Sequence, residues 1–514
     1  MKKYYITTAI DYANSKPHIG HAYEKVFADI IARYKRLCGY EVYFCTGTDE
    51  HSLNVAEKAK QLNKDPKTFC DEMALNFKEL CRIYNITNTD FIQTTEERHK
   101  KSVEEVFNRI YKTGDIYKGH YEGWYCKSCE NFYNQKELLE GNLCPVHKIK
   151  VDLIKEENYF LKASKYTDTL LKYINDNVDF IQPETRKNEI VSLLKQGFKD
   201  ISVSRTGLDW GIKLPIDNTQ TVYVWFDALI NYISAVGFTT ENEKFNKWWP
   251  ADAHIIGKDI IKFHCIIWPI MLMSAGIKLP KKVFAHGFLL NKGEKMSKTR
   301  GNIVDPVNLV NVFGADAIRY YFAAAVVSGQ DGEFSEESII LRYNNDLAND
   351  FGNLVSRTLN MVEKYFQNII PEHYRELFDE KMSSLVNQIN NLYSVYSKKM
   401  ENFEFSGAIE NIWSIIKIAN KFIEDEAPWN LNKNNKLKEL ANVIYILLEV
   451  IRVSSLAVQP VMPETSKKIW QMLNLDYETD KFDIEKELKF GLIKSGHKID
   501  KSRILFPRIV DEKK

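Results

Sequence analysis

A chain of 514 residues exceeds the size at which a single hydrophobic core keeps growing, so we expect two to four domains. The 44% hydrophobic and 27% charged residues are typical of a soluble globular protein, and a net charge of +1 excludes steering of nucleic acid by the overall field. No signal-peptide apolar region follows Met1 and no run of about 18 apolar residues occurs, so we expect a cytoplasmic protein without a membrane span.

The first elements along the chain alternate between strand and helix. Residues 3–10 are rich in aromatic and β-branched side chains and predict a buried strand. Residues 20–38 carry apolar side chains at helical spacing and stop before Gly39, a residue favoured at helix C-termini. Residues 41–46 predict a second strand, and the order strand–helix–strand implies a parallel sheet with a right-handed crossover.

Similar patterns return in three later segments, at 221–236, 253–275 and 283–290. We predict that they complete one doubly wound, Rossmann-like parallel sheet with helices on both faces, the α/β fold class. The stretch from 116 to 220 differs, because it holds closely spaced cysteines, scattered glycines and irregular strands. It predicts a zinc-binding domain inserted between the two halves of the sheet.

From residue 335 onward the pattern becomes helical. Long amphipathic runs predict a C-terminal α-helical bundle, and they cover residues 336–366, 376–400, 406–425 and 434–457. The predicted domains are the first half of the Rossmann-like domain at 1–115, an inserted connective domain at 116–220, the second half at 221–334 and the helical domain at 335–514.

The segment His18-Ile19-Gly20-His21 falls between the first predicted strand and the first long helix. At the start of a helix, free backbone N–H groups and the helix dipole favour an anionic phosphate. Gly20 lets the backbone approach a nucleotide, and the two imidazoles can donate hydrogen bonds to phosphate oxygens. The alternative is a surface loop that happens to contain two histidines, and the strand-to-helix setting favours phosphate binding.

A second motif, Lys295-Met296-Ser297-Lys298-Thr299, follows a strand-like run and a short turn. Two lysines three residues apart on a loop are suited to hold a triphosphate while charge develops on the departing pyrophosphate. Alone, such a segment is more often a solvated basic loop. Paired with the histidine motif, it predicts a nucleotide site.

Closely spaced cysteines predict a metal site in the inserted stretch. Cys126 and Cys129 form a CxxC pair, and Cys144 and His147 form a CxxH pair after fourteen intervening residues. Two ligand pairs that close on each other are the arrangement of one tetrahedral structural zinc, with no open position for catalysis. Five further cysteines lie in apolar surroundings and predict reduced core thiols: Cys38, Cys45, Cys70, Cys81 and Cys265.

The histidine and lysine motifs, in this order and setting, resemble the HIGH and KMSKS signatures of the class I aminoacyl-tRNA synthetases, with Thr299 where the family pattern ends in Ser. Four further segments resemble the methionyl-tRNA synthetase family: 8–14, 47–51, 224–228 and 257–264. The resemblance covers nearly the whole chain. It implies a ligase that activates methionine with ATP and Mg²⁺ and transfers the methionyl group to initiator and elongator methionine tRNA.

The resemblance also assigns residues to sites. The nucleotide site would use His18, Gly20, His21, Gly257, Asp259, Lys295, Met296, Ser297, Lys298 and Thr299. Asp49 would hold the ammonium group of the substrate, in a methionine pocket built from Ala9, Ile10, Tyr12, Trp225, Tyr232, Ile260, His264 and Trp268. The chain departs from the family at Asp11, where family members often carry Pro.

These pocket residues also fit a thioether on physical grounds. Ile260, His264 and Trp268 are spaced four apart, so they form one stripe along a helix face, and aromatic walls pack favourably against sulfur. Such a stripe more often reflects ordinary core packing. Taken alone, His264 is more often a core histidine whose hydrogen bonds are made within the protein. Asp49 lies just past the second predicted strand, where ligands bind in open α/β sheets.

Three residues of the helical region match anticodon readers of the family by resemblance: Asn353, Arg357 and Trp429. Asn353 and Arg357 are four apart and therefore share a helix face. An aromatic ring can stack on an unstacked loop base, while Arg and Asn reach base edges. Taken singly, each is more often an ordinary surface residue or a core tryptophan.

Three alternatives to this reading are weaker. A synthetase for leucine, isoleucine or valine carries a far larger editing insertion than the stretch 116–220. A tRNA-binding paralogue without catalysis does not need the intact histidines and lysines of the two motifs. A small-molecule nucleotidyltransferase leaves the helical bundle without a purpose. Because the chain ends soon after the bundle, we expect a monomer.

Overall fold

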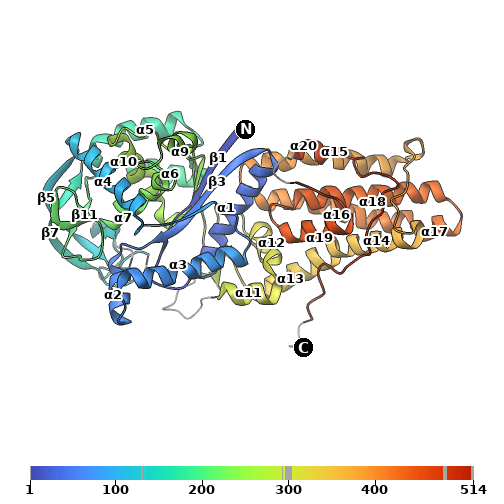
Figure 1. Cartoon of the computed structure of the whole chain (residues 1–514), viewed down its shortest axis with the longest axis horizontal. Coiled ribbons are helices and arrows are strands. Elements are labelled where there is room, and N and C mark those ends of the chain that lie inside the picture. Colours follow the sequence, from blue (N-terminus) through green and yellow to red (C-terminus); the bar gives the residue numbers. More distant parts are fainter. Residues whose placement is uncertain are drawn as a thin grey trace. The chain divides into compact units, whose positions relative to one another are not determined.

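The structure is a computed structural model that describes residues 2–128, 131–133, 135–146, 148–291, 293–295, 304–478 and 483–510 (Figure 1). The chain forms two compact units. The sheet unit comprises Lys3–Ala28 and Val42–Phe288, and the helical unit comprises Met1–Lys2, Asp29–Glu41 and Leu289–Lys514.

Within the described residues, the sheet unit is built on a seven-stranded sheet in the order β2-β3-β1-β13-β14-β8, with β4 paired to β3. Its strands are β1 (Lys2–Thr8), β2 (Asp11–Tyr12), β3 (Tyr40–Asp49), β4 (Asp90–Gln93), β8 (Ile181–Gln182), β13 (Ala253–Gly257) and β14 (Val283–His286). β13 pairs parallel with both β1 and β14. The strands β2 and β4 both pair parallel with β3. The predicted parallel α/β class is confirmed.

The first crossover forms as its sequence indicates. Helix α1 (Ile19–Leu37) connects β2 to β3 and ends before Gly39, which has a φ of 76°. This left-handed conformation suits glycine, and it lets the chain turn back into the sheet. Gly47 has a different role, because a Cβ there would lie 2.0 Å from the backbone oxygen of Ile92. Glycine therefore permits the close pairing of β3 with β4.

Two parts of the sheet differ from the prediction. Residues 221–236 contribute no strand to it, since β12 (Asp217–Val222) pairs antiparallel with β10 (Ser204–Thr206) and β11 (Lys213–Leu214) in a separate sheet. Conversely, β8 comes from the stretch predicted as an insertion and pairs parallel with β14. A strand of two residues has no period to detect, and the partner of a strand is chosen by tertiary contact rather than by local pattern.

The stretch after residue 116 is dominated by one long antiparallel pair. β5 (Ile116–Cys126) and β7 (Asp152–Leu161) align from Ile116 opposite Leu161 to Tyr125 opposite Asp152. Two short strands, β6 (Asn131–Tyr133) and β9 (Ile201–Ser202), complete this sheet. Helices α5 (Thr167–Asp176) and α6 (Glu184–Lys195) follow within the same stretch.

The helical unit confirms the predicted bundle. A π-helical segment, Tyr343–Gly352, joins α13 to α14. The bundle helices are α13 (Glu336–Arg342), α14 (Asn353–Phe366), α15 (Glu380–Glu401), α16 (Phe405–Glu426), α17 (Pro428–Lys433), α18 (Leu437–Ala457) and α19 (Pro463–Met472). Their central member is α18, which packs against α14, α15, α16, α17 and α19.

One expectation about membranes needs correction. Among the described helices, α18 is long and apolar enough to cross a membrane by length and composition, with a mean hydropathy of 1.7 over its 18-residue window. That whole window is buried inside the chain. A helix that is apolar all round and covered by neighbours is a core helix of the bundle.

Candidate active site

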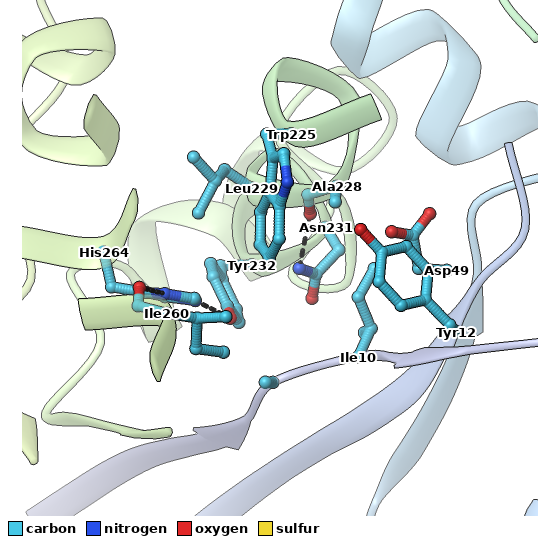
Figure 2. Close-up of a pocket in the computed structure, with 11 residues that line it drawn as sticks. Ile10, Tyr12, Asp49, Trp225, Ala228, Leu229, Asn231, Tyr232, Ile260 and His264 are labelled. Atoms are coloured by element: carbon cyan, nitrogen blue, oxygen red, sulfur yellow. Dashed lines mark hydrogen bonds between the residues drawn. The ribbon is translucent and has the colours of Figure 1, made fainter. Parts of the chain in front are cut away.

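A pocket opens in the sheet unit beyond the carboxyl ends of β1 and β3 (Figure 2). It contains about 320 Å³ of space not filled by protein atoms, part of it open to solvent. Residues from four stretches of the chain line it: Ala9, Ile10, Tyr12, Asp49, Trp225, Ala228, Leu229, Asn231, Tyr232, Ile260 and His264. This is the place where open α/β sheets bind their ligands.

Eight of the nine residues assigned to the methionine pocket by resemblance meet here. The exception is Trp268, which is fully buried and packs against Tyr232 with a centroid distance of 6.0 Å. The helix expected to carry the stripe is irregular, with a 3-10 turn at Lys258–Ile260, a π-helix at Phe263–Ile267 and an α-helix only from Trp268.

Three lining residues were missed from the sequence: Ala228, Leu229 and Asn231. Ala228 and Leu229 lie three and four positions after Trp225, on one helical face with it, and Tyr232 continues that face. This spacing was a signal that could have found the two apolar residues. Asn231 gave no comparable signal.

The aromatic wall is held by stacking and by a hydrogen-bonded pair. Trp225 stacks on Phe263 with centroids 3.7 Å apart, and Tyr12 meets Trp225 edge-on at 6.2 Å. His264 Nδ1 lies 3.0 Å from the carbonyl oxygen of Ile260, which can only accept, so Nδ1 carries the proton. His264 Nε2 therefore accepts from the Tyr232 hydroxyl at 2.7 Å.

Burial keeps this pair neutral. Burial lowers the pKa of His264 to about 4, although the Ile260 carbonyl acts in the opposite direction. Burial and the nearby Glu24 carboxylate raise the pKa of Tyr232 well above its ordinary value, although the Asn231 amide acts in the opposite direction. Near neutral pH the wall is thus polar at two points and uncharged, as an apolar ligand side chain requires.

Asp49 and Glu50 are adjacent carboxylates with different surroundings. Asp49 is the last residue of β3 and lines the pocket. The Glu50 carboxylate accepts hydrogen bonds from Thr48 at 2.8 Å, from Gln93 at 2.9 Å and from Thr95. Glu50 is therefore committed to the protein interior, and Asp49 is the carboxylate that faces the pocket.

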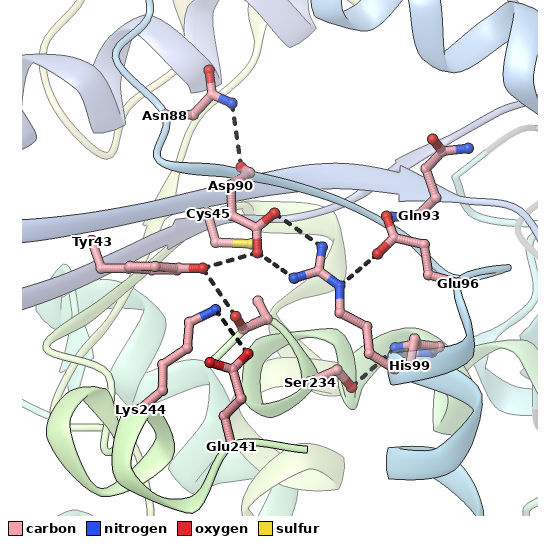
Figure 3. Close-up of polar contacts among 12 residues, drawn as sticks. Tyr43, Cys45, Asn88, Asp90, Gln93, Glu96, His99, Ser234, Glu241 and Lys244 are labelled. Carbon is pink, nitrogen blue, oxygen red and sulfur yellow. Dashed lines mark hydrogen bonds and ion pairs between the residues drawn. The ribbon is translucent and has the colours of Figure 1, made fainter. Parts of the chain in front are cut away.

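A buried carboxylate behind the pocket joins three elements. Asp227 on α7 (Val224–Leu229) receives hydrogen bonds from His51 Nδ1 at 2.8 Å and from His99 Nε2 at 2.7 Å. His99 also contacts the Ser234 hydroxyl at 3.2 Å (Figure 3). Burial acts to raise the pKa of Asp227, but the two imidazoles outweigh it and lower the pKa to about 2. The charged carboxylate ties the end of β3, helix α4 (Glu97–Lys112) and α7 together.

A neighbouring hydrogen-bond network holds helix α4 against the sheet. The Arg98 guanidinium donates to both carboxylate oxygens of Asp90, at 2.6 and 2.9 Å. The Tyr43 hydroxyl donates to Asp90 at 2.9 Å, and Glu96 accepts from the Gln93 backbone N–H at 3.0 Å (Figure 3). These contacts fix the start of α4, which carries His99, against β3 and β4.

The two histidines of the first motif stack on each other at the start of α1, with ring centroids 3.8 Å apart. His18 Nδ1 accepts from the Gly20 backbone N–H at 3.1 Å, and His21 Nδ1 accepts from the His18 backbone N–H at 3.0 Å. Both rings therefore carry their proton on Nε2 when neutral. A Cβ at Gly20 would lie 2.9 Å from His18 Cε1, so glycine permits this packing.

Asp11 links the histidine pair to the pocket. Its neighbour Tyr12 lines the pocket, while Asp11 lies 3.7 Å from His21 Nε2 and pairs with the buried Lys25. Burial acts to lower the pKa of Lys25, but the Asp11 and Glu24 carboxylates outweigh it and raise that pKa. Two residues of β2 thus connect a candidate phosphate site with a candidate amino-acid site.

Comparisons with known proteins agree with this geometry. The family described as "tRNA synthetases class I (M)" matches residues 4–152 and 136–359. The family described as "Anticodon binding domain of methionyl tRNA ligase" matches residues 372–514. The chain belongs to the methionyl class I tRNA synthetases.

Individual relatives cover the chain from end to end. The methionine–tRNA ligase of Caldanaerobacter subterraneus is 47% identical over all of this chain and 80% of the relative. That of Thermotoga maritima is 45% identical over 99% of this chain and 80% of the relative. The structure of Mycobacterium tuberculosis methionyl-tRNA synthetase in complex with methionyl-adenylate is 40% identical, with a TM-score of 0.94 over 99% of this chain and 100% of that one.

The KMSKS-like motif of this methionyl synthetase begins in a small sheet. β16 (Glu294–Lys295) pairs antiparallel with β15 (Leu289–Asn291), which also pairs parallel with β17 (Gly332–Glu333). Met296, Ser297, Lys298 and Thr299 lie outside the described residues. Of the other predicted nucleotide residues, Asp259 is exposed, and a Cβ at Gly257 would come within 2.8 Å of its carboxylate.

Two of the four predicted zinc ligands are described. Cys126 and Cys144 are fully buried in one small cluster with Tyr133 and Val151. Cys129 and His147 lie outside the described residues, and within the remainder no group of three or more His, Cys, Asp or Glu is arranged to hold a metal. Four of the other five cysteines are buried and Cys38 is half-buried.

The three candidate anticodon residues lie in the helical unit. Asn353 is exposed at the start of α14, and one turn later Arg357 forms an ion pair with Glu424 at 2.6 Å. Glu424 is in the last turn of α16, five residues before Trp429, which is 43% exposed on α17. The structure thus brings Arg357 near the segment that carries an exposed tryptophan.

Proposed function

We propose that this chain is a methionine–tRNA ligase whose described pocket binds methionine. Family membership gives the reaction: methionine and ATP form methionyl-adenylate and pyrophosphate, and the methionyl group then passes to the 3′ end of methionine tRNA. The observation that supports this location of the methionine site is the pocket itself. It combines a single facing carboxylate, an aromatic wall and a neutral histidine at the sheet edge.

The parts of methionine match the parts of the pocket. The ammonium group needs a carboxylate, which Asp49 supplies. The thioether needs an apolar, polarizable surface, and sulfur packs favourably on the rings of Trp225 and Tyr232. A protonated His264 would place a charge in this wall, and its lowered pKa prevents that near neutral pH.

The nucleotide would bind next to the pocket, at the histidine pair. The proton on Nε2 of each ring can be donated to a phosphate oxygen, and the N-terminal end of α1 favours negative charge. We propose that Lys295 and Lys298 contact the same triphosphate, and that Gly257 and Asp259 form a further part of this site. Mg²⁺ enters with ATP, bound mainly through phosphates and water.

The reaction requires the protein to position the substrates, and no side chain has to act as a nucleophile. A methionine carboxylate oxygen attacks the α-phosphorus, and the bond from that phosphorus to the pyrophosphate oxygen breaks. Asp49 holds the amino group so that the carboxylate points toward the histidine pair, which lies beyond β2. Fixing two reactants in this way replaces an encounter by an intramolecular step, and donors at the phosphates stabilise the developing charge.

The helical unit would recognise the tRNA. Its match to a methionyl anticodon-binding domain supports this role, and the exposed Trp429 offers a stacking surface for a base. We propose that Asn353 and Arg357 reach base edges. In addition, we propose that Cys126, Cys129, Cys144 and His147 hold one structural zinc, which the burial of Cys126 and Cys144 in one cluster supports.

The test is ATP–pyrophosphate exchange with each of the twenty amino acids. Methionine should support exchange, and leucine or isoleucine doing so equally well would contradict the assignment of the pocket. Metal analysis of freshly purified protein should give one zinc per chain. The domain boundaries, the cytoplasmic location and the monomeric state stay predictions, the last of which sedimentation equilibrium checks.

A further inference from the structure

A buried amide oxygen of a pocket-lining residue, Asn231, has no hydrogen-bond partner among the described residues. Asn231 begins α8 (Asn231–Ser234), is 1% exposed and lines the pocket. Its amide Nδ2 donates to the carbonyl oxygen of Ala228 at 2.7 Å. Because a carbonyl oxygen only accepts, this contact fixes which way the amide points. The other atom, Oδ1, is buried and has no hydrogen-bond partner among the described residues.

The position of Asn231 connects it to the substrate. Figure 2 shows its side chain between Tyr232 and Asp49, with the carboxamide oxygen directed away from Ala228. Buried acceptors in folded proteins are almost always paired, and exceptions call for an explanation. An acceptor left open in a ligand pocket is explained if the ligand brings the donor.

Methionine offers few donors. Its thioether sulfur and its carboxylate only accept hydrogen bonds, so at neutral pH the donors of the free amino acid are the three N–H bonds of its ammonium group. We infer that Asn231 Oδ1 is a second acceptor for this ammonium group, beside Asp49. The inference rests on the proposed function, that the pocket takes methionine.

A neutral second acceptor has a physical advantage over a second carboxylate. Two buried carboxylates at one site repel, and one of them then tends to hold a proton. An amide oxygen adds a hydrogen bond without this repulsion and leaves Asp49 charged. Paired acceptors also select for a free amino group, because the nitrogen of an N-acylated methionine is uncharged and has a single N–H. Asn231 is thus a specificity-determining residue.

The experiment compares ligands that differ at the amino group. Methionine and methioninol keep the ammonium group, whereas 4-(methylthio)butanoate lacks it. Dissociation constants of all three ligands are measured by tryptophan fluorescence for the wild type, Asn231→Ala and the control Leu229→Ala. Leu229 lines the same pocket but has no polar side-chain atom.

Asn231→Ala should weaken methionine and methioninol about tenfold, which corresponds to about 1.4 kcal/mol, and should leave 4-(methylthio)butanoate nearly unchanged. Leu229→Ala should weaken all three ligands by a similar factor. An equal loss for the three ligands in Asn231→Ala, or unchanged methionine binding, overturns the inference.

Two further results separate the possible failures. If Asn231→Ala does not fold, Asn231→Ser is measured instead. Because the serine hydroxyl can still accept a hydrogen bond, Asn231→Ser should lose less methionine affinity than the tenfold expected for Asn231→Ala. An equal loss of affinity for all three ligands again overturns the inference. If the wild type itself fails to bind methionine, the proposed function fails. If the wild type binds methionine and only the ligand selectivity is absent, the role of Asn231 alone fails.

Discussion

The methionine pocket and the anticodon candidates present their side chains in opposite ways. In the pocket, Asp49, Tyr232 and His264 are 1–3% exposed, and hydrogen bonds hold the last two in place before any ligand arrives. In the helical unit, Trp429 and Asn353 are exposed, and Arg357 forms an ion pair with Glu424. A small ligand gains most from fixed groups in a dry site, whereas a base reader must stay accessible and gains less from each contact.

The largest effect should come from Asp49→Asn, which keeps the shape of the side chain and removes its charge. The ammonium group would then be buried without a counter-charge, so kcat/KM for methionine in exchange should fall about 100- to 1000-fold, or about 3–4 kcal/mol. Glu50→Gln is the control, because Glu50 is bonded within the protein. It should lower the melting temperature and leave the KM for methionine near the wild-type value. A similar loss in both variants would contradict the division of roles.

Asp227→Asn should act on stability and on its pH dependence. The pKa of Asp227 in the folded protein is about 2, below its ordinary value of 3.8, so the charged form stabilises the fold above pH 4, and this contribution is lost as the pH falls toward 2. A shift of this size corresponds to about 2 kcal/mol at neutral pH.

Urea unfolding at pH 7 and at several values between pH 4 and pH 2 measures this effect. The free energy of unfolding of the wild type should exceed that of Asp227→Asn by the largest amount at pH 7. This difference should shrink as the pH falls from 4 to 2. A difference that stays constant down to pH 2 would show that the imidazole contacts do not lower the pKa of Asp227.

Trp429→Ala should separate the two half-reactions. Loss of a stacking surface should lower kcat/KM for tRNA about tenfold, or about 1.4 kcal/mol, while methionine-dependent exchange stays at the wild-type rate. Val395→Ala on α15 is a matched control, since Val395 is 44% exposed and Trp429 is 43% exposed. If exchange falls together with aminoacylation in a folded Trp429→Ala protein, the helical unit is not the part that recognises the anticodon.

Tyr232→Phe should have a moderate effect that is confined to the pocket. The variant removes the hydroxyl that donates to His264 Nε2 and leaves a buried acceptor unpaired, so methionine affinity should fall by about 1 kcal/mol. Titration of exchange with methionine measures it as an increase in KM of about fivefold. An unchanged KM would mean that the histidine orientation does not depend on Tyr232.

Glu424→Gln should have the smallest effect, in the direction of tighter tRNA binding. The change removes the charge that pairs with Arg357, and exposed ion pairs contribute at most about 1 kcal/mol. Affinity for tRNA should therefore rise by less than about fivefold, and binding at two salt concentrations measures it. Weaker tRNA binding in this variant would place Glu424, rather than Arg357, in contact with the nucleic acid.

The sequence predicted most of the scaffold because its signals are local. Apolar side chains at helical spacing predicted the helices 336–366, 376–400, 406–425 and 434–457, and the structure has helical segments in each range. The failures are equally informative. The sequence pattern places residues 221–236 in the main sheet and leaves β8 out of it, contrary to the structure, because a strand carries no local mark of its partner.

For the site, the sequence by itself determined which residue types are present and, for His18, Gly20 and His21, their setting before a helix. Spacing and resemblance named eight residues that line one pocket, since residues at strand ends and on one helix face are brought together by regular geometry. Only the tertiary structure decided the rest. Trp268 is buried against Tyr232 instead of lining the pocket, the donors around Glu50 hold its carboxylate inside the protein, and the Ala228 carbonyl orients Asn231. Each of these depends on a contact between side chains or carbonyl groups whose geometry no residue type or spacing specifies.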